Sequence, residues 1–212
     1  MRHDFAGLAP SIATAPAPAT QTKDSSDATL IARVATGNRL AMQVLFARHH
    51  ARVYQFILRL VGSEAAAEDL TSEVFLCVWR QASAFAARSS VTTWLLAIAR
   101  YKAIAELRRR PVLDVVSVQT SNPADDPEAS LAIKHRGEIL RNCLRGLSPR
   151  HREIIDLVYY HEKSVQEAAE ILGLSGNTVK TRMFYARKKL SRLLAESRRR
   201  RRARVIEACR CV

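Results

Sequence analysis

Apolar residues recur at intervals of three and four along most of the chain, which is the pattern of amphipathic helices. In the first half, this pattern and its Ser, Asn and Gly positions predict four helices. They span 27–37, capped by Asp27 and stopped by Gly37; 38–62, capped by Asn38; 63 to about 81, capped by Ser63; and 91–110, ended by Pro111. A polar loop at 82–90 separates the last two.

The helical pattern stops at 111–130, in P-V-L-D-V-V-S-V-Q-T-S-N-P-A-D-D-P-E-A-S. Three prolines and an acidic cluster predict a flexible linker there. Periodicity resumes in segments 131–145, 149–160, 165–172 and 176 to about 195. Strand-like alternation is scarce, so the sequence predicts an all-α protein with two small helical domains, 27–110 and 131–195. Residues 1–26 are predicted to be a disordered tail and 196–212 an Arg-rich C-terminal tail.

The stretch S-V-Q-E-A-A-E-I-L-G-L-S-G-N-T-V-K-T-R-M-F-Y-A-R-K-K-L at 164–190 predicts a helix-turn-helix unit. Ser164 and Glu167 form a capping box at its first helix, Gly173 ends that helix, and Ser175 caps the second. In the second helix, one stripe is apolar. It consists of Val179, Met183, Ala186 and Leu190. The opposite side therefore carries polar, basic and aromatic groups suited to a DNA major groove, although an ordinary helical hairpin with a charged face remains the alternative.

Charge strengthens the nucleic-acid interpretation of the C-terminal half. The formal net charge is +14, and residues 180–212 contain 13 Lys and Arg against 2 Asp and Glu. Clustered cations gain affinity for phosphates by displacing counterions. The Arg run from Arg198 to Arg202 with Arg204 is a candidate nonspecific DNA clamp; a solvated, solubilising tail is the alternative.

Other features of the composition narrow the class of protein. No apolar run reaches the roughly 18 to 20 residues of a membrane span, and the N-terminus lacks the layout of a secretory signal. Cys77 and Cys143 fit core positions, while Cys209 and Cys211 raise a minor redox or metal hypothesis. His161-Glu162 resembles the start of H-E-x-x-H, but Val165 stands where the second histidine is needed. We expect no metal, no cofactor and a cytoplasmic location.

Three segments carry a resemblance to a known family. A-A-E-D-L-T-S-E-V-F-L-C-V-W at 66–79 and V-T-T-W-L-L-A-I-A-R-Y-K-A-I-A-E-L-R-R-R at 91–110 resemble region two of bacterial sigma factors of the sigma-70 family, most closely the extracytoplasmic-function group. The segment that starts L-S-P-R-H-R-E-I-I at 147 resembles region four of the same group. The two matches cover roughly 27–110 and 131–194, in the expected order and separated by a linker.

The resemblance implies three sets of contact residues. Core polymerase contacts are implied for Asp69, Glu73 and Trp79. Contacts with the minus-10 element are implied for Phe85, Ser89, Thr92, Thr93, Trp94, Arg100, Tyr101, Lys102, Arg108 and Arg109. Contacts with the minus-35 element are implied for Lys180, Thr181 and Arg182, and less directly for Tyr185. Asn177, Thr178 and Lys188 in the same helix are further candidates for contact with this element.

Alternatives stay open for several of these residues. The acidic helix at 64–79 also fits a solvated face with a core Trp79, and Trp94 fits the core as well as a stacking platform. The chain also departs from the family pattern, with Tyr101 where Asn is frequent, Ala105 where Asp is frequent, and Tyr185 where Arg is frequent. These departures concern the base preference at both promoter elements.

The sequence thus predicts a dissociable sigma factor that binds core RNA polymerase, directs it to promoters, promotes DNA melting and has no catalysis of its own. By resemblance, an anti-sigma factor is expected as a partner and would allow indirect attachment to a membrane. Two rivals are a dimeric helix-turn-helix regulator, which leaves the acidic helix without a use, and a nucleic-acid-processing enzyme, which would need clustered carboxylates or a nucleophile in a pocket.

Overall fold

The computed structural model describes residues 26–109 and 137–210, and side chains up to Arg200. Every regular element in this part of the chain is helical, which confirms the all-α prediction. The first half contains α1 (Asp27–Ala35), α2 (Arg39–Val61), α3 (Glu64–Gln81), the short 3-10 helix η1 (Ala82–Ala84) and α4 (Val91–Arg109). The predicted tail before Ser26 and the predicted linker lie outside the described residues.

Local capping explains where the first helices begin and end. Asn38 Oδ1 accepts a hydrogen bond from Ala41 N–H at the start of α2, and Gly62 ends α2 in the left-handed conformation at φ 70°. The predicted cap of α1 is wrong by one residue. Ser26 Oγ accepts from Thr29 N–H, while the Asp27 carboxylate is drawn away into contacts with α2.

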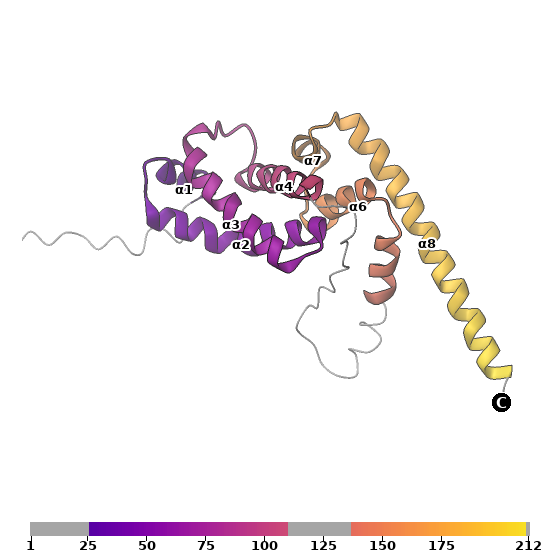
Figure 1. Cartoon of the computed structure of the whole chain (residues 1–212). Helices are drawn as coiled ribbons and strands as arrows, with labels where there is room; N and C mark the ends of the chain where they lie inside the picture. The colour runs from indigo at the N-terminus through magenta and orange to yellow at the C-terminus, as the bar shows by residue number, and fades with distance from the viewer. Residues whose placement is uncertain (1–25, 110–136, 211–212) are drawn as a thin grey trace, which may run out of the picture.

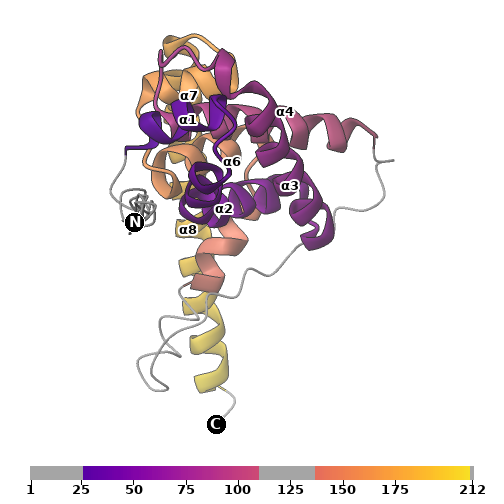
Figure 2. The same ribbon diagram turned by 90° about the vertical axis from the view of Figure 1, so that its left-hand side faces the viewer.

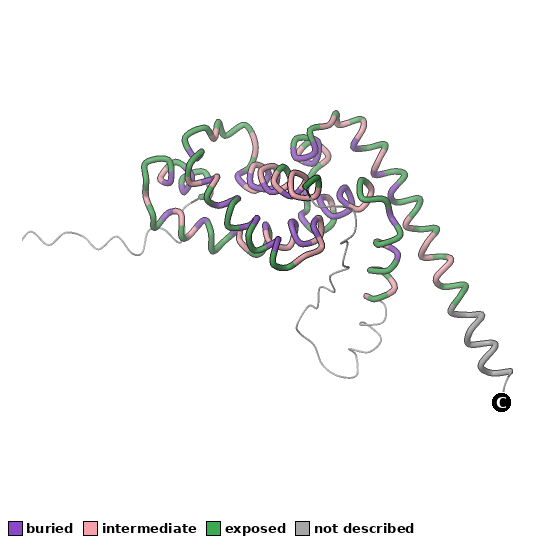
Figure 3. The backbone as a smooth tube through the Cα atoms, viewed as in Figure 1, coloured by how far each residue is buried: buried purple, intermediate pink, exposed green. Residues whose placement is uncertain are grey.

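Helices α1 to α4 form an N-terminal bundle in which α2 packs against α1, α3 and α4 (Figure 1). Their buried faces follow the apolar stripes of the sequence, as the purple stretches of Figure 3 show. The largest fully buried side chains of this bundle include Leu30, Ile31, Leu45, Val53, Phe56, Ile57, Val74, Leu95 and Leu96.

The C-terminal bundle comprises helical residues 137–145, α6 (Pro149–Ile155), the π-helix η2 (Asp156–Tyr160), α7 (Val165–Leu172) and α8 (Gly176–Arg210). The predicted single α-helix over 149–160 is therefore wrong in its second half. There the turn widens, and His161 N–H donates to the Asp156 carbonyl five residues earlier at 3.2 Å. This wider turn leaves Asp156 and Leu157 buried and Tyr159 and Tyr160 on the surface.

Helix α8 is much longer than predicted, since it runs to Arg210 instead of ending near Ala195. Leu190 and Leu193 continue its apolar stripe and pack on the core, so the helix has no reason to end before the Arg-rich segment. Leu190 and Leu194 also line a surface hollow of about 570 Å³, opposite Leu140 and Leu144. The C-terminal part of α8 projects away from the rest of the molecule (Figures 1 and 2).

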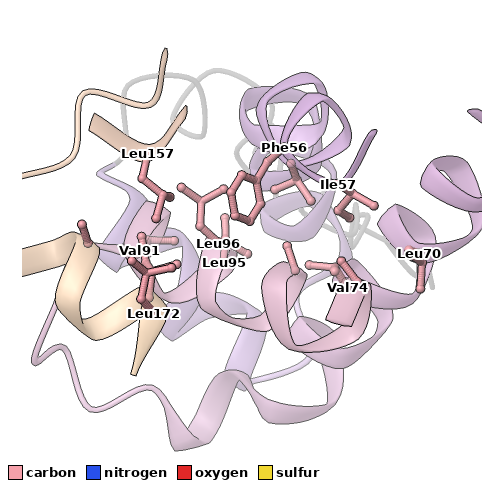
Figure 4. Close-up of a cluster of buried hydrophobic side chains, with 14 of the residues drawn as sticks. Phe56, Ile57, Leu70, Val74, Val91, Leu95, Leu96, Leu157 and Leu172 are labelled. Carbon is pink, nitrogen blue, oxygen red and sulfur yellow. The ribbon is translucent and has the colours of Figure 1, made fainter. Parts of the chain in front are cut away.

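The two bundles pack against each other through α4 and α7. Their apolar side chains belong to one continuous core, part of which Figure 4 shows: Leu157 points towards Leu96 and Phe56, and Val91 lies beside Leu172. Each of these five side chains is no more than 5% exposed. The sequence predicted two domains joined by a linker, but it gave no sign of this contact between them.

Candidate nucleic-acid interface

The helix-turn-helix unit has the predicted local geometry. Ser164 Oγ accepts from Glu167 N–H at 3.2 Å, and Glu167 Oε2 accepts from Ser164 N–H at 3.1 Å, which completes the capping box. Gly173 then adopts φ 63°, and Leu174 N–H donates to the Ala169 carbonyl at 3.0 Å. These bonds end α7 cleanly and fix the angle at which α8 leaves the turn.

The first four turns of α8 present one buried and one exposed face, as predicted. Val179, Met183 and Ala186 are buried, and Leu190 is half-buried against the core. Of the predicted minus-35 residues, the exposed ones are Asn177, Lys180, Thr181, Tyr185 and Lys188, and the half-buried ones are Thr178 and Arg182. Phe184 is 61% exposed and its ring lies 5.4 Å from that of Tyr185, so an aromatic pair adjoins the polar groups.

This face has the chemistry that duplex DNA requires. Asn and Thr side chains near the helix start are hydrogen-bonding groups for base edges, and the lysines further along are positioned for phosphates. Thr178 N–H donates to Ser175 Oγ at 3.3 Å, so the helix start is capped by a neutral hydroxyl. The positive end of the helix dipole therefore remains available to a phosphate.

The predicted minus-10 segment lies in the loop after η1 and along α4. The rings of Phe85 and Trp94 pack 5.1 Å apart, and both side chains are half-buried against the core. Core packing is thus what the structure shows for Trp94. Ala87, in the same loop, has φ 52°, a left-handed conformation that costs a residue with Cβ about 1 kcal/mol.

The other residues of the minus-10 set fall into two groups. Tyr101 is 77% exposed, Arg108 and Arg109 are exposed, and Ser89 and Thr92 are half-buried. In contrast, Thr93 is only 1% exposed, and both Arg100 and Lys102 form ion pairs. Lys102 Nζ lies 2.7 Å from Glu73 Oε2, which joins the predicted DNA and polymerase sets.

The acidic face of α3 is exposed as predicted. Glu64, Glu68, Asp69 and Glu73 all reach the surface. Burial of the Tyr54 phenol, and then the charges of Glu64 and Glu68, raise the pKa of Tyr54. The Tyr54 hydroxyl therefore lies near the carboxylates of Glu64 and Glu68. Trp79 is half-buried against the core, so only part of its surface is accessible to a partner.

A polar cluster joins the two bundles at the N-terminal end of α4. Lys163 Nζ donates to Thr93 Oγ1 at 3.0 Å, to Ser90 Oγ at 3.3 Å and to Glu167 Oε1 at 2.8 Å. Thr93 Oγ1 donates to the same carboxylate oxygen at 2.7 Å. Partial burial raises the pKa of Glu167, but hydrogen bonds from Lys163, Thr93 and Ser164 N–H and the Lys163 charge outweigh it and lower the pKa to about 2.

Two more polar contacts link the bundles. Arg100 Nε donates to Glu153 Oε1 at 2.6 Å, and Arg59 pairs with Asp156 while its guanidinium lies 4.2 Å from the centre of the Tyr160 ring. His161 stands edge-on to Phe56, with ring centroids 5.2 Å apart. Together these contacts line the seam between α2, α4, α6 and η2.

Sequence reasoning missed the residues of this seam. They are Arg59, Glu153, Asp156, His161 and Lys163. A signal was available, because charged residues at positions that the helical period buries need a partner. Glu153 and Asp156 interrupt the apolar face of 149–160 in this way, but a single sequence does not say which cations face them.

Neither a metal site nor a membrane span appears in the part of the chain that the structure describes. No group of three or more His, Cys, Asp or Glu side chains is arranged to hold a metal ion there. None of the helices described is long and apolar enough to cross a membrane. Cys209 and Cys211 lie beyond the described side chains, so the redox or metal hypothesis for them stays a hypothesis.

Family models match both halves of the chain. The model of sigma-70 region 2 matches residues 45–111, and that of sigma-70 region 4 matches 137–190. Among curated proteins, the ECF RNA polymerase sigma factor SigK of Mycobacterium tuberculosis is 31% identical over 78% of this chain and 91% of its own length. The RNA polymerase sigma factor YlaC of Bacillus subtilis is 28% identical over 76% of this chain and 96% of its own.

Solved structures of other proteins have a similar arrangement of helices. CnrH, in complex with the cytosolic domain of CnrY, is 28% identical with a TM-score of 0.60, over 81% of this chain and 99% of that one. The sigma factor RpoE of Bartonella quintana, in complex with the anti-sigma factor NepR, has a TM-score of 0.58 over 71% of this chain and 94% of that one. At 24% identity, the second likeness supports the fold alone.

Proposed function

Because the chain belongs to the sigma-70 family of RNA polymerase sigma factors, in its ECF group, we propose that it directs polymerase to promoters and uses separate surfaces to bind core polymerase and promoter DNA. The N-terminal bundle corresponds to region 2 and the C-terminal bundle to region 4. One observation carries the proposal, which is that a single chain has two kinds of surface. The C-terminal bundle presents the polar and basic face of α8, which suits DNA. The N-terminal bundle presents the acidic face of α3 beside the basic and aromatic helix α4. A sigma factor needs both surfaces.

Region 4 reads the minus-35 element as duplex. Asn177, Lys180 and Thr181 face outwards at the start of α8, where a recognition helix meets base edges. Lys188, two turns later, contacts a phosphate. Tyr185 and the neighbouring Phe184 add an apolar surface that suits a thymine methyl group.

Region 2 holds the separated minus-10 strand. The strongest candidates are Tyr101, whose exposed ring offers a stacking surface, and Arg108 and Arg109, which offer charge to the backbone. Stacking on an aromatic ring stabilises an unpaired base by about 1 to 3 kcal/mol, and cations follow the phosphates. Phe85 and Trp94 pack against each other and stabilise the loop, so we do not assign either ring to stacking on a base.

The acidic face of α3 binds core polymerase. Asp69 and Glu73 are exposed carboxylates, which suit a basic partner, and Glu73 exchanges its pair with Lys102 for that contact. Because polymerase supplies the phosphodiester chemistry, we propose that this chain contributes specificity and melting but no catalytic residue. It then acts in the cytoplasm, where polymerase and promoters are.

An anti-sigma factor is a further proposed partner. The family resemblance implies one, and CnrH was solved bound to a protein partner. An operator-binding regulator is the weaker account, because family models match both regions and such a regulator has no use for region 2.

Transcription reconstituted in vitro tests the proposal. Core polymerase with this protein is expected to make a transcript from a promoter that core alone does not use. Asp69→Lys is expected to abolish the transcript by weakening polymerase binding, whereas Glu170→Lys, an exposed charge change on α7, serves as the matched control. Equal transcription with Asp69→Lys and the control would remove the assigned role of α3.

A further inference from the structure

The outer face of α8 continues beyond the residues assigned to the minus-35 element. Thr181, Tyr185 and Lys188 lie on this face at intervals of three and four. The same intervals, continued along the helix, lead to Arg192 and Arg199. All five side chains are exposed, and the buried stripe of the helix lies on the opposite side. The face proposed to read DNA therefore runs without a break into the Arg-rich end of α8, residues 191–210.

The Arg-rich end of α8 is strongly positive and accessible. It holds eight arginines and two glutamates, and it projects from the rest of the molecule (Figures 1 and 2). Arg192 Nε pairs with Glu196 Oε1 at 3.3 Å. Arg198, Arg199 and Arg200 are exposed, and none of the three forms an ion pair with another described residue. Such cations gain affinity for a polyanion by releasing counterions, and duplex DNA is the polyanion that lies along this face when α8 reads a promoter.

Length separates these arginines from the groove that holds the start of α8. At a rise of about 1.5 Å per residue, Lys188 lies about 10 Å along the helix axis from Thr181, and Arg199 lies about 27 Å from it. The major groove of B-DNA is about 12 Å wide, so Lys188 falls near the phosphates at its edge. The groove winds around the duplex, whereas α8 contains no Gly or Pro after Gly176 at which to bend with it. Arg199 therefore lies where the surface of a straight duplex has curved away from the helix.

We propose that the Arg-rich end of α8 binds the DNA that flanks the minus-35 element and holds it bent towards the helix. The inference rests on the proposed function, because region 4 must first place the start of α8 in the groove. Bending a duplex costs free energy, which the additional phosphate contacts offset. These contacts read no base edges, so they add affinity for any flanking sequence and favour flanks that bend easily.

Three neighbouring arginines allow the charge to be removed while the helix is kept. The Gln variant combines Arg198→Gln, Arg199→Gln and Arg200→Gln, since Gln forms helix about as well as Arg. The Lys variant replaces the same three residues by Lys, which retains the charge and should behave like wild type. A charge-matched control changes three exposed arginines on α2 and α3 instead. It combines Arg39→Gln, Arg52→Gln and Arg80→Gln.

Binding of the full chain to two duplexes tests the proposal. Both contain the minus-35 element; the short one has about 12 base pairs, little more than one helical turn, and the long one about 30. We expect wild-type protein, the Lys variant and the control to bind the long duplex about tenfold more tightly than the short one, and the Gln variant to lose most of this gain. Dyes about 20 base pairs apart on either side of the element, roughly 70 Å in straight DNA, should show higher energy transfer with wild type than with the Gln variant.

The outcomes separate the bend from the proposed function. An equal gain from the flanks in wild type and the Gln variant overturns the proposal, and so does a gain without a change in energy transfer, because the DNA then reaches the arginines unbent. If the Gln variant keeps its DNA binding but loses affinity for single-stranded RNA, the Arg-rich end of α8 binds transcripts and the proposal fails. Should the Gln variant not fold, truncation after Ala195 gives the same comparison. Failure of wild type to prefer the short duplex over a scrambled one would instead overturn the role of region 4, on which the bend depends.

Discussion

Thr93 in region 2 donates its hydroxyl hydrogen to Glu167 Oε1 in region 4 at 2.7 Å, although 74 residues separate them in the sequence. The same Glu167 carboxylate also completes the capping box of α7. One side chain thus holds the start of the helix-turn-helix unit and the contact between the regions. Local folding of region 4 and its packing against region 2 are therefore energetically linked.

Acid should weaken this linkage. The pKa of Glu167 is lowered from 4.5 to about 2, so its contribution is present above about pH 4.5 and is lost as pH falls towards 2. After a discount for its partial exposure we expect about 1 to 2 kcal/mol. Glu167→Gln should lower the free energy of unfolding in urea by this amount at neutral pH and by much less near pH 2.

The control for this experiment is Glu170→Gln on the exposed side of the same helix, which should change stability little at any pH. A difference between wild type and Glu167→Gln that stays constant from about pH 6 to pH 2 would contradict the assigned hydrogen bonds.

Cap residues offer a second prediction. Ser164→Ala removes the hydroxyl that accepts from Glu167 N–H and should destabilise the protein by about 1 kcal/mol, with a melting temperature lower by several degrees. Ser164→Asp retains an acceptor at the cap and should come close to wild type. Equal losses in both variants would point to a role for the serine other than capping.

Substitutions at two residues of α8, Thr181 and Lys188, should reduce DNA affinity in different ways. Thr181→Ala removes a candidate base contact and should reduce binding to a minus-35 duplex by about 1 to 3 kcal/mol, with the largest loss on the preferred sequence. Lys188→Ala should weaken binding to all sequences alike and lower the salt slope by about one. Arg80→Ala on α3 is the control; sequence-selective loss in Lys188→Ala would reverse the two roles.

The Arg-rich end of α8 is predicted to add nonspecific affinity for DNA. Because α8 is continuous from the recognition face to Arg210, these arginines belong to the same helix as the predicted minus-35 contacts. Truncation after Ala195 should reduce the dependence of duplex binding on salt by several units of slope, at about 0.9 for each phosphate that is no longer neutralised. An unchanged slope would leave the segment as a solubilising helix.

Local chemistry made much of this protein predictable. Ser63, Asn38 and Gly62 marked helix ends, and the capping box with Gly173 located the helix-turn-helix unit. The buried stripe of α8 followed from spacing alone. Such features depend on neighbours in the sequence, so a single chain is enough to reveal them.

What the sequence did not reveal depends on long-range packing. The pairs of Arg100 with Glu153 and Lys163 with Thr93 join residues 53 and 70 positions apart, and no local rule selects those partners. The widened turn at 156–160 arises where tertiary packing overrides local expectation. The continuation of α8 past Ala195 has a local cause instead, because arginine is a good helix former and no Gly or Pro interrupts residues 196–210. As a result, Thr93 was predicted as a contact with the minus-10 element, and its hydrogen bonds to region 4 were not foreseen.

The most direct test of the account is permanganate footprinting of a candidate promoter with core RNA polymerase, with and without this protein. Unpaired thymines near the start site should react only when both proteins are present, which would also map the minus-10 element. If the protein protects duplex DNA by itself and no thymine becomes reactive with core polymerase, region 2 does not open promoters and the proposed function is wrong.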